Sequence, residues 1–372
     1  MFYNFFKKFL RSFFDFKKYL KLEKENKEII FYAENEWQWD FFKDIIKYLT
    51  LKKKLHICYI TSSQTDGALK RKLKNFHSFY VGLSYIRTIF FSTLNTKILI
   101  TSLADLDNLE IKRSKFSVHY IYVPHTLLST HMIFREKAFD NYDTFFCSSP
   151  NHIKEIRETE RINKSKNKKL VKFGYSRIDK IIKRKKLKKI YKYKIKVLIA
   201  PSWGKNSLFE TGAKELIDFL LKKNYVVTIR PHPETLKLNQ SCIDKLLLNF
   251  KNKKNFFYKP NTSSTNDYFN NDILISDWSG AAFEYALGTL KPVIFLNLPK
   301  KINNKNYKKI KFEPIEIKMR KQMGVIVEPK NFIEIEKKIK FLLNTKTYWK
   351  KKLLSIRKKT INNLGNSGLV GG

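Results

Sequence analysis

The chain has 372 residues, with 75 Lys and Arg against 33 Asp and Glu, so its formal net charge is +42. This length favours two domains over one. The charge suggests a polyanionic partner, but the basic residues are spread over the whole chain and no zinc spacing or nucleic-acid-binding motif occurs, so we expect no nucleic-acid partner. Three widely separated cysteines, Cys58, Cys147 and Cys242, predict reduced thiols in a cytosolic protein.

Residues 1–22 predict an amphipathic helix. Large apolar residues recur at alternating spacings of four and three and would line one face: Phe2, Phe6, Phe9, Phe13, Phe16 and Leu20. Basic residues fall largely on the other face: Lys7, Arg11, Lys18 and Lys21. No run of apolar residues in this stretch is long enough to span a bilayer, and no signal-peptide cleavage site follows one. We interpret residues 1–26 as a membrane-surface helix; the alternatives are a helix packed on the protein's own core and a partner helix.

Residues 27–182 predict an α/β domain, because short apolar strands alternate with helical segments. The expected strands are 29–33, 55–60, 97–101, 118–123 and 144–147, with a helix over 36–49, a second helix after His131 as far as Phe139 and a third from Ser176. The strand over 118–123 leads directly into Pro124 and His125. We interpret Asp105-Leu106-Asp107 as a surface turn and predict no protein-bound metal.

The charge-dense segment 183–194 is the predicted linker to a second α/β domain, residues 195–345. Its expected strands are 196–200, 225–229, 256–258, 273–275, 293–296 and 324–327, and its expected helices cover 206–221, 243–248 and 332–343. Residues 346–372 predict a last helix over 349–361 followed by a flexible tail.

One strand–helix–strand unit, residues 272–299, has the small residues that an anion site at a helix N-terminus needs. Ser276 and Asp277 end its first strand, Ser279 is a plausible N-cap, and the helix runs to about Leu287 and stops at Gly288. The N–H groups of the first turn could receive a phosphate. A plain strand–helix–strand unit with a tight turn is the alternative.

A second strand of this domain, 225–229, runs into Arg230-Pro231-His232-Pro233. The two prolines end the strand and stiffen the loop, so Arg230 and His232 are held at the edge of the sheet where doubly wound folds bind ligands. A structural histidine is the plainer interpretation of His232.

In combination these segments resemble the CDP-glycerol glycerophosphotransferases, which build teichoic acid and related cell-wall and capsule polymers. The residues that carry the resemblance are Val123-Pro124-His125 to His131, Ala200-Pro201-Ser202-Trp203, Arg230-Pro231-His232-Pro233 and Ser276-Asp277-Trp278-Ser279 with the helix that follows. The resemblance covers roughly residues 115–300. It implies two Rossmann-like domains facing a cleft, the GT-B arrangement, and a GT-B enzyme's last helix often packs back across the first domain.

The resemblance also implies site residues. His125 would be the general base and His232 a phosphate contact or acid, the two facing each other across the cleft; His131 is a rival for the base, because the family usually has Gly where this chain has Thr126. The expected donor-binding residues are Ser202, Arg230, Ser276, Asp277, Ser279, Gly280 and Glu284, with Glu284 placed for the nucleotide ribose. No cofactor is expected beyond the CDP-linked donor as substrate.

The predicted function is transfer of glycerol phosphate, or a related polyol phosphate, from the CDP-linked donor to a lipid-linked or polymeric glycan, with release of CMP, by a peripheral protein at the cytoplasmic face of the membrane. Two alternatives stay open at this point: a GT-B glycosyltransferase or related epimerase that uses a UDP-sugar, and a non-enzymatic basic protein that binds membrane or nucleic acid. The sequence leaves the polyol, the acceptor and the oligomeric state undefined.

Overall fold

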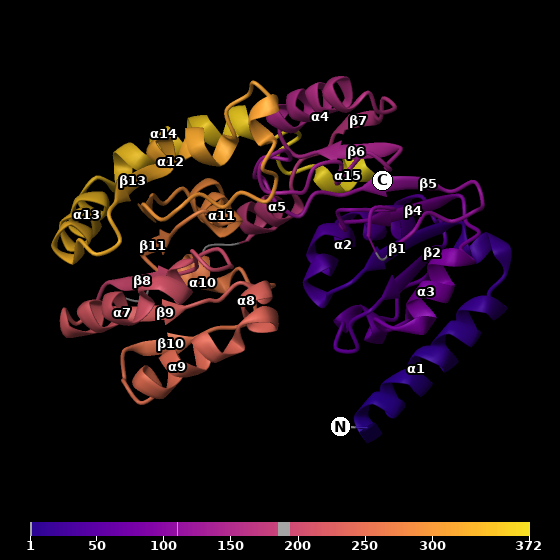
Figure 1. The fold of residues 1–372 in the computed structure, drawn as a ribbon, viewed down its shortest axis with the longest axis horizontal. Helices are drawn as coiled ribbons and strands as arrows, with labels where there is room; N and C mark the ends of the chain where they lie inside the picture. The colour runs from indigo at the N-terminus through magenta and orange to yellow at the C-terminus, as the bar shows by residue number, and fades with distance from the viewer. Residues whose placement is uncertain (1, 110, 185–193) are drawn as a thin grey trace. The chain divides into compact units, whose positions relative to one another are not determined.

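A computed structural model of the chain describes residues 2–109, 111–184 and 194–372, and the side chains from residue 6 onward. The chain forms two compact units (Figure 1). Unit 1 comprises Met1–Arg177, Asn303–Phe312 and Ile361–Gly372, and unit 2 comprises Ile178–Ile302 and Glu313–Thr360. Both units are discontinuous in sequence, whereas the predicted domains are continuous segments. Most of the predicted linker, residues 185–193, lies outside the described residues.

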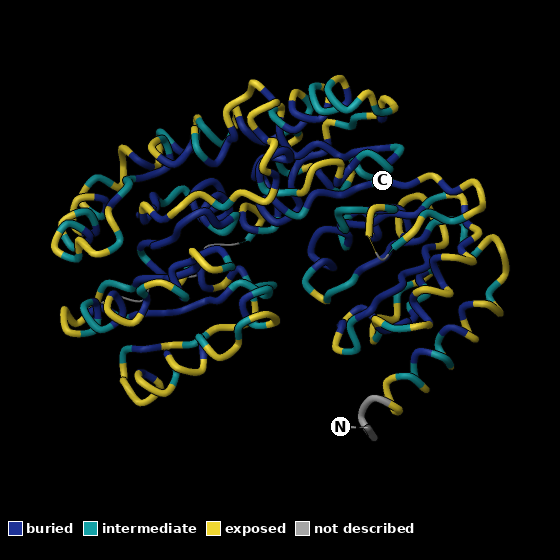
Figure 2. The backbone as a smooth tube through the Cα atoms, in the orientation of Figure 1, coloured by how far each residue is buried: buried dark blue, intermediate teal, exposed yellow. Residues whose placement is uncertain are grey.

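Unit 1 is built on a seven-stranded sheet in which all paired strands are parallel, in the order β3-β2-β1-β4-β5-β6-β7. Its central strands are Ile-, Leu-, Phe- and Tyr-rich and buried, as expected when helices cover both faces of a parallel sheet (Figure 2). The strands are β1 (Ile29–Ala33), β2 (Ile57–Thr61), β3 (Phe76–Tyr80), β4 (Ile98–Thr101), β5 (His119–Tyr122), β6 (Thr144–Cys147) and β7 (Lys169–Lys172). The helices are α1 (Phe2–Lys21), α2 (Trp39–Lys47), α3 (Tyr85–Ser92), α4 (Pro150–Asn163) and α15 (Ser367–Gly371), with short helical turns at Lys24–Lys27, Glu36–Gln38, Tyr48–Lys52, Gly67–Lys70 and Tyr307–Lys309.

Unit 2 is built on a six-stranded sheet, also parallel, in the order β10-β9-β8-β11-β12-β13. The strands are β8 (Lys196–Ile199), β9 (Val226–Ile229), β10 (Phe256–Tyr258), β11 (Ile273–Ser276), β12 (Val293–Leu296) and β13 (Gly324–Val327). The helices are α5 (Ser176–Lys183, beginning in unit 1), α6 (Leu208–Thr211), α7 (Ala213–Lys222), α8 (Pro233–Leu238), α9 (Gln240–Phe250), α10 (Asn266–Asn270), α11 (Gly280–Thr289), α12 (Ile315–Met323), α13 (Phe332–Asn344) and α14 (Lys346–Thr360).

Both sheets reverse their strand order beside their first strand, at β1/β4 in unit 1 and at β8/β11 in unit 2. A doubly wound sheet binds ligands at the carboxyl ends of its strands, next to this reversal. The loops that follow β8 and β11 carry Ser202 and Asp277, and the loop after β5, next but one to β1, carries His125. The fold therefore brings the predicted site residues of each unit to its ligand-binding edge.

Helix α1 forms as predicted, but its apolar residues do not share one environment. Phe16 and Tyr19 are buried in the core of unit 1, and Phe9 and Phe13 pack partly against that core. Phe6 and Leu20, which the prediction places on the same face, are each 53% exposed. The side chain of Phe2 lies outside the described residues. One face of α1 therefore belongs to the protein's own core.

Several predicted elements differ in the structure. Strands β3 and β7 and helix α3 were not predicted, and the expected helix between His131 and Phe139 is absent, because residues 132–140 form turns. The expected helix over 206–221 is divided at Gly212 into α6 and α7. Helix α11 continues past Gly288 to Thr289, and Leu290, with φ of 59°, ends it. Gly288 lies inside the helix, where Ile181 packs so closely that a Cβ would lie 2.8 Å from the Ile181 Cγ2 atom.

The predicted flexible tail is wrong, because the end of the chain is packed into unit 1. The Asn362 main-chain N–H donates to the carbonyl oxygen of Ser148 at 2.9 Å, and its side-chain amide donates to that of Cys147 at 3.0 Å. Helix α15 then packs against α2 so closely that Cβ atoms on Gly368 and Gly371 would overlap Asp44 and Phe173. Small residues at the end of the chain thus permit close helix packing.

Candidate active-site residues of the two units

Four neighbouring strands of unit 2 send their loops to one edge of the sheet. Ser202 and Trp203 follow β8, His232 follows β9, Asp277 follows β11, and Lys301 follows β12. Since the carboxyl ends of parallel strands share an edge, residues that are up to a hundred positions apart in sequence lie in adjoining loops.

Asp277 joins two of these loops. Its carboxylate accepts hydrogen bonds from the main-chain N–H of Ser202 at 2.6 Å and of Leu208 at 3.3 Å. The Ser276 hydroxyl donates to the carbonyl oxygen of Ala200 at 2.8 Å. Asp277 is 1% exposed, and burial raises the pKa of its carboxyl group. Both predicted donor-binding side chains are therefore used to hold the loops after β8 and β11 together.

Ser279 caps helix α11. Its hydroxyl oxygen accepts from the main-chain N–H of Ala281 at 3.2 Å, with an extended backbone at Ser279, so the predicted N-cap is confirmed. Gly280 and Ala281 are half-buried in the first turn. The helix is ten residues long and carries no acidic side chain in that turn, so the positive end of its dipole is not neutralised from within.

Arg230 and Glu284 are connected through Tyr268 of α10. The Arg230 guanidinium lies 4.1 Å from the centre of the Tyr268 ring and donates to its hydroxyl, and that hydroxyl donates to the Glu284 carboxylate at 2.8 Å. Arg230 also contacts the carbonyl oxygen of Ser264 at 3.5 Å. Arg230 and Glu284 are 3% and 8% exposed. These contacts hold the loop after β9 against α10 and α11.

His232 is the N-cap of α8, and this contact defines its tautomer. Its Nδ1 accepts from the main-chain N–H of Glu234 at 3.1 Å, so in the neutral ring the proton lies on Nε2. The His232 ring lies 6.1 Å from that of Trp203, measured between centroids. The histidine can therefore donate a hydrogen bond or a proton through Nε2.

His125 in unit 1 has the opposite tautomer. Its Nδ1 lies 3.1 Å from the carbonyl oxygen of Ser102, at the end of β4, and must donate to it, so Nε2 carries the lone pair. Among the described residues, no group hydrogen-bonds this Nε2. The rings of Trp37, Phe41 and Phe134 surround the imidazole at centroid distances of 5.6, 6.5 and 5.7 Å. This desolvation lowers the pKa of His125 to about 4, so the ring is neutral at pH 7.

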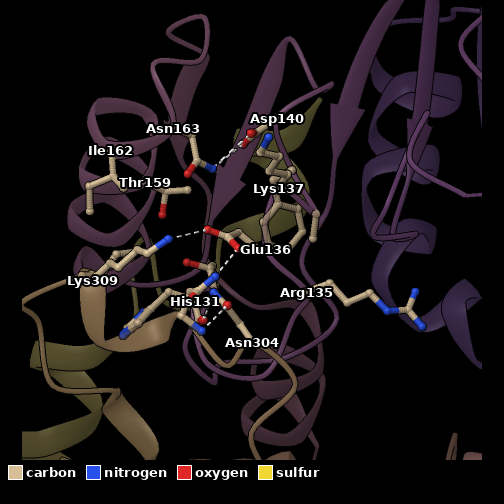
Figure 3. A pocket seen from close by; sticks show the side chains of 15 residues that line it. His131, Arg135, Glu136, Lys137, Asp140, Thr159, Ile162, Asn163, Asn304 and Lys309 are labelled. Atoms are coloured by element: carbon tan, nitrogen blue, oxygen red, sulfur yellow. Dashed lines mark hydrogen bonds and ion pairs between the residues drawn. The ribbon is translucent and has the colours of Figure 1, made fainter.

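His131, the predicted rival, is buried within unit 1. The side chain is 1% exposed, its Nε2 donates to the carbonyl oxygen of Phe312 at 3.2 Å, and its Nδ1 lies 3.4 Å from Glu155. It lines a small polar pocket between the 130–140 loop and residues 304–310 (Figure 3). There Lys309 reaches Glu136 at 3.5 Å and the Asn304 amide donates to the carbonyl oxygen of His131 at 3.0 Å. The pocket lies between two segments of unit 1, and His125 is not among the residues that line it.

Two cationic side chains of unit 2, Lys301 and Arg320, were not predicted as site residues from the sequence. The Lys301 ammonium lies 3.5 Å from the centre of the Trp203 ring. The Arg320 guanidinium lies 3.9 Å from the centre of the Trp278 ring and donates to the carbonyl oxygen of Leu296 at 2.6 Å. Burial lowers the pKa of Lys301 to about 7 and that of Arg320 to about 10. In a chain with 75 basic residues, no composition signal distinguishes these two.

No group of three or more His, Cys, Asp or Glu side chains in the described part of the chain is arranged to hold a metal ion. The two aspartates of the predicted surface turn, Asp105 and Asp107, both have left-handed backbone conformations, and Asp105 pairs with Arg135 at 3.2 Å.

Within 2–109, 111–184 and 194–372, no helix is long and apolar enough to cross a membrane.

Comparison with known proteins gives the chain its family. The sequence model described as CDP-glycerol:poly(glycerophosphate) glycerophosphotransferase matches residues 14–309. The chain belongs to this family. It is a transferase enzyme, a glycerophosphotransferase with CDP-glycerol as its donor. A search of curated proteins found no match.

Solved structures confirm the fold class, two Rossmann-like α/β domains of GT-B type. The wall teichoic acid polymerase TagF, in a structure with CDPG, is similar with a TM-score of 0.57 at 14% identity, over 99% of this chain and 96% of that one. The UDP-GlcNAc 2-epimerase of Methanocaldococcus jannaschii has a TM-score of 0.56 at 12% identity, over 91% and 97% of the two chains. A Rickettsia africae glycosyltransferase has a TM-score of 0.51 at 12% identity, over 92% and 96%.

Proposed function

We propose that the chain transfers glycerol phosphate from CDP-glycerol to a hydroxyl of a lipid-linked or polymeric glycan acceptor in teichoic acid synthesis. The acceptor oxygen attacks the phosphorus that carries glycerol, a new P–O bond forms, and the bond from that phosphorus to the CMP oxygen breaks. Charge builds on the phosphoryl oxygens during this step, so the reaction needs a base for the acceptor and hydrogen-bond donors around the phosphates.

The observation that carries this proposal is the pair of opposite tautomers. The His125 imidazole is neutral at pH 7 and its Nε2 carries a lone pair. This is the form in which a histidine can act as the general base and take the acceptor proton. His232 Nε2 carries a proton, which suits a donor to a phosphoryl oxygen or to the departing CMP. Because His131 donates from one nitrogen and packs against Glu155 with the other, we assign the base role to His125 alone of these two.

For the donor, we propose the loops at the carboxyl edge of the unit 2 sheet. The N–H groups at the start of α11, with Ser279 and Gly280, would receive the diphosphate. Ser202, Ser276 and Asp277 position these loops, and the same positioning role fits Arg230 and Glu284, whose polar groups are bound to Tyr268. The predicted contact of Glu284 with the ribose would require Tyr268 to share the Glu284 carboxylate with the ligand.

A donor screen tests the proposed function. Purified protein is incubated with CDP-glycerol, CDP-ribitol and UDP-GlcNAc in the presence of a poly(glycerophosphate) acceptor, and the released nucleotide is identified by chromatography. We expect CMP from CDP-glycerol, in equal amount to the glycerol phosphate gained by the acceptor. Release of UDP without any CMP would favour the epimerase- or glycosyltransferase-like alternative instead.

We further propose that the exposed face of α1 attaches the enzyme to an anionic membrane. Phe6, Leu10 and Phe14 are 53%, 36% and 55% exposed and follow one another at a spacing of four, so they form a row on the helix. Exposed lysines flank this row: Lys7, Lys17, Lys18 and Lys21. Aromatic burial combined with attraction to anionic headgroups gives stronger binding than either alone.

This proposal predicts that Phe6→Ser combined with Phe14→Ser reduces binding to vesicles containing anionic lipid by roughly tenfold, as loss of two large apolar groups from an interface should. Deletion of residues 1–22 is a poorer test, because it would also uncover the core around Phe16 and Tyr19. Leu248→Ser, at a 72% exposed position on α9, is the matched control and should bind like the wild type. If the double variant sediments with the vesicles to the same extent as the wild type, α1 does not attach the enzyme to the membrane.

A further inference from the structure

Lys301 is a cation without a counter-ion at the edge of the unit 2 sheet. Its ammonium group stands over the face of Trp203, and among the described residues it has no hydrogen bond and no ion pair. The side chain is half-buried. By contrast, the two neighbouring buried cations are engaged, Arg230 by Tyr268 and Arg320 by the carbonyl oxygen of Leu296.

The groups around Lys301 come from four elements. Asp277 after β11 and Glu234 on α8 are the carboxylates whose charge acts on the ammonium, but the Asp277 oxygens are already occupied by the main-chain N–H groups of Ser202 and Leu208. His232 stands beside Trp203, and Arg320 on α12 adds a positive charge near Asp277. Desolvation outweighs the two carboxylates, so the pKa of Lys301 falls to about 7.

We infer that Lys301 is the side chain that binds the diphosphate of the nucleotide donor, held over Trp203 so that its ammonium meets the phosphate oxygens. This inference rests on the proposed donor site. An aromatic face fixes a cation without neutralising its charge, and the N–H donors that point away from the ring stay available for an anion. The location fits as well, because Lys301 follows β12, the strand next to β11, whose loop leads into α11.

The inference has a consequence in proton uptake. In the unliganded protein Lys301 is only partly protonated at neutral pH, whereas a diphosphate next to the amine favours the ammonium form. Donor binding should therefore take up roughly three-quarters of a proton at pH 7.5. The amine of a buried lysine can titrate near neutral pH, whereas a guanidinium stays protonated there. Lys301→Arg should therefore bind CDP-glycerol without this proton uptake.

The test is calorimetric titration of CDP-glycerol at pH 7.5 in two buffers of different ionisation enthalpy, which gives both affinity and proton uptake. We expect uptake by the wild type and by Lys300→Met, an exposed neighbour that serves as control. Lys301→Arg should keep its affinity within roughly threefold and lose the uptake, and Lys301→Met should bind at least roughly tenfold more weakly. Melting curves establish that each variant is folded.

Unchanged affinity in Lys301→Met, or the same uptake in Lys301→Arg as in the wild type, would overturn the inference and leave the donor site in place. Absence of CDP-glycerol binding by the wild type would overturn the proposed donor site as well. If Lys301→Met does not fold, the uptake measured with Lys301→Arg decides the question by itself.

Discussion

His125 and His232 each have one ring nitrogen fixed by the main chain, and in both cases that nitrogen is Nδ1. The partner differs: a carbonyl oxygen accepts from His125, and an N–H group donates to His232. Each partner is a backbone group at the end of a strand or the start of a helix, so the fold itself selects which histidine presents a lone pair and which presents a proton.

At the residue scale, the low pKa of His125 predicts the acid limb of the pH profile. The pKa is lowered from 6.5 to about 4, so protonation of His125 should reduce kcat/KM only well below pH 6.5. Between these values the unfolded chain binds more protons than the folded one, so folding stability contributed by this group rises with pH from 4 to 6.5. His125→Asn keeps an N–H donor for Ser102 and should flatten that part of the stability profile. An acid limb centred at pH 6.5 or above would contradict the assignment.

The sequence predicted both histidines as candidate site residues because each follows a β-branched or aromatic strand and a proline, which marks the carboxyl end of a strand. It did not identify Lys301, whose ammonium group contacts Trp203, 98 residues earlier in the chain, nor the linkage of Arg230 and Glu284 through Tyr268. Side-chain contacts between loops of different strands leave no local pattern, so these contacts became visible only in the folded structure.

At the element scale, the first turn of α11 tests the proposed donor site through Ala281. Ser279 is less suitable for substitution, because it is 6% exposed and caps the helix. Ala281→Glu places a negative charge at the N-terminus of α11, where it favours the helix by about 0.3–1 kcal/mol but repels a diphosphate. We expect an equal or higher melting temperature and roughly tenfold weaker CDP-glycerol binding, in contrast to Ala281→Gln, which has the same size without the charge. Equal binding by the two variants would place the phosphates elsewhere.

Helix α15 supplies a second element-scale prediction. A Cβ on Gly368 would lie 2.7 Å from the Cβ of Asp44 and 3.0 Å from its main-chain carbonyl, so Gly368→Ala must push α15 away from α2. Overpacking of this kind costs about 1–3 kcal/mol, and thermal unfolding should register a lower midpoint. Gly67→Ala, where no atom lies within 4 Å of the added Cβ, is the control. A midpoint unchanged by Gly368→Ala would mean that the C-terminal segment is loosely attached after all.

The sequence predicted most central strands because they are continuous apolar runs, and missed the two edge strands of unit 1 for the opposite reason. Strand β3 contains His77 and Ser78, and β7 begins and ends with exposed lysines, because an edge strand is covered less completely. The helix expected after His131 does not form, and contacts with a distant segment replace its hydrogen bonds. The carbonyl oxygens of Met132 and Ile133 accept hydrogen bonds from Asn303, which lies 170 residues after Ile133.

At the scale of the whole molecule, length and the alternation of strands and helices predicted the two-domain class. They did not predict which segments of the chain belong to which unit. Residues 303–312 and 361–372 return to unit 1 after the chain has entered unit 2. The first of these segments closes over His131, and the second packs on α2. Composition and periodicity report which segments are helices or strands, whereas the unit to which a segment belongs depends on contacts distant in sequence.

The most direct test of the central claim is the rate of a single turnover, measured as CMP released from CDP-glycerol in the presence of acceptor. His125→Asn retains the donor to Ser102, and His232→Asn retains an acceptor for the Glu234 N–H, so both variants should fold normally while each slows transfer by roughly a hundredfold or more. His119→Asn, at a histidine whose ring nitrogen Nε2 hydrogen-bonds the Thr144 hydroxyl, is the matched control and should transfer within about twofold of the wild type. Wild-type rates in both His125→Asn and His232→Asn would contradict the account.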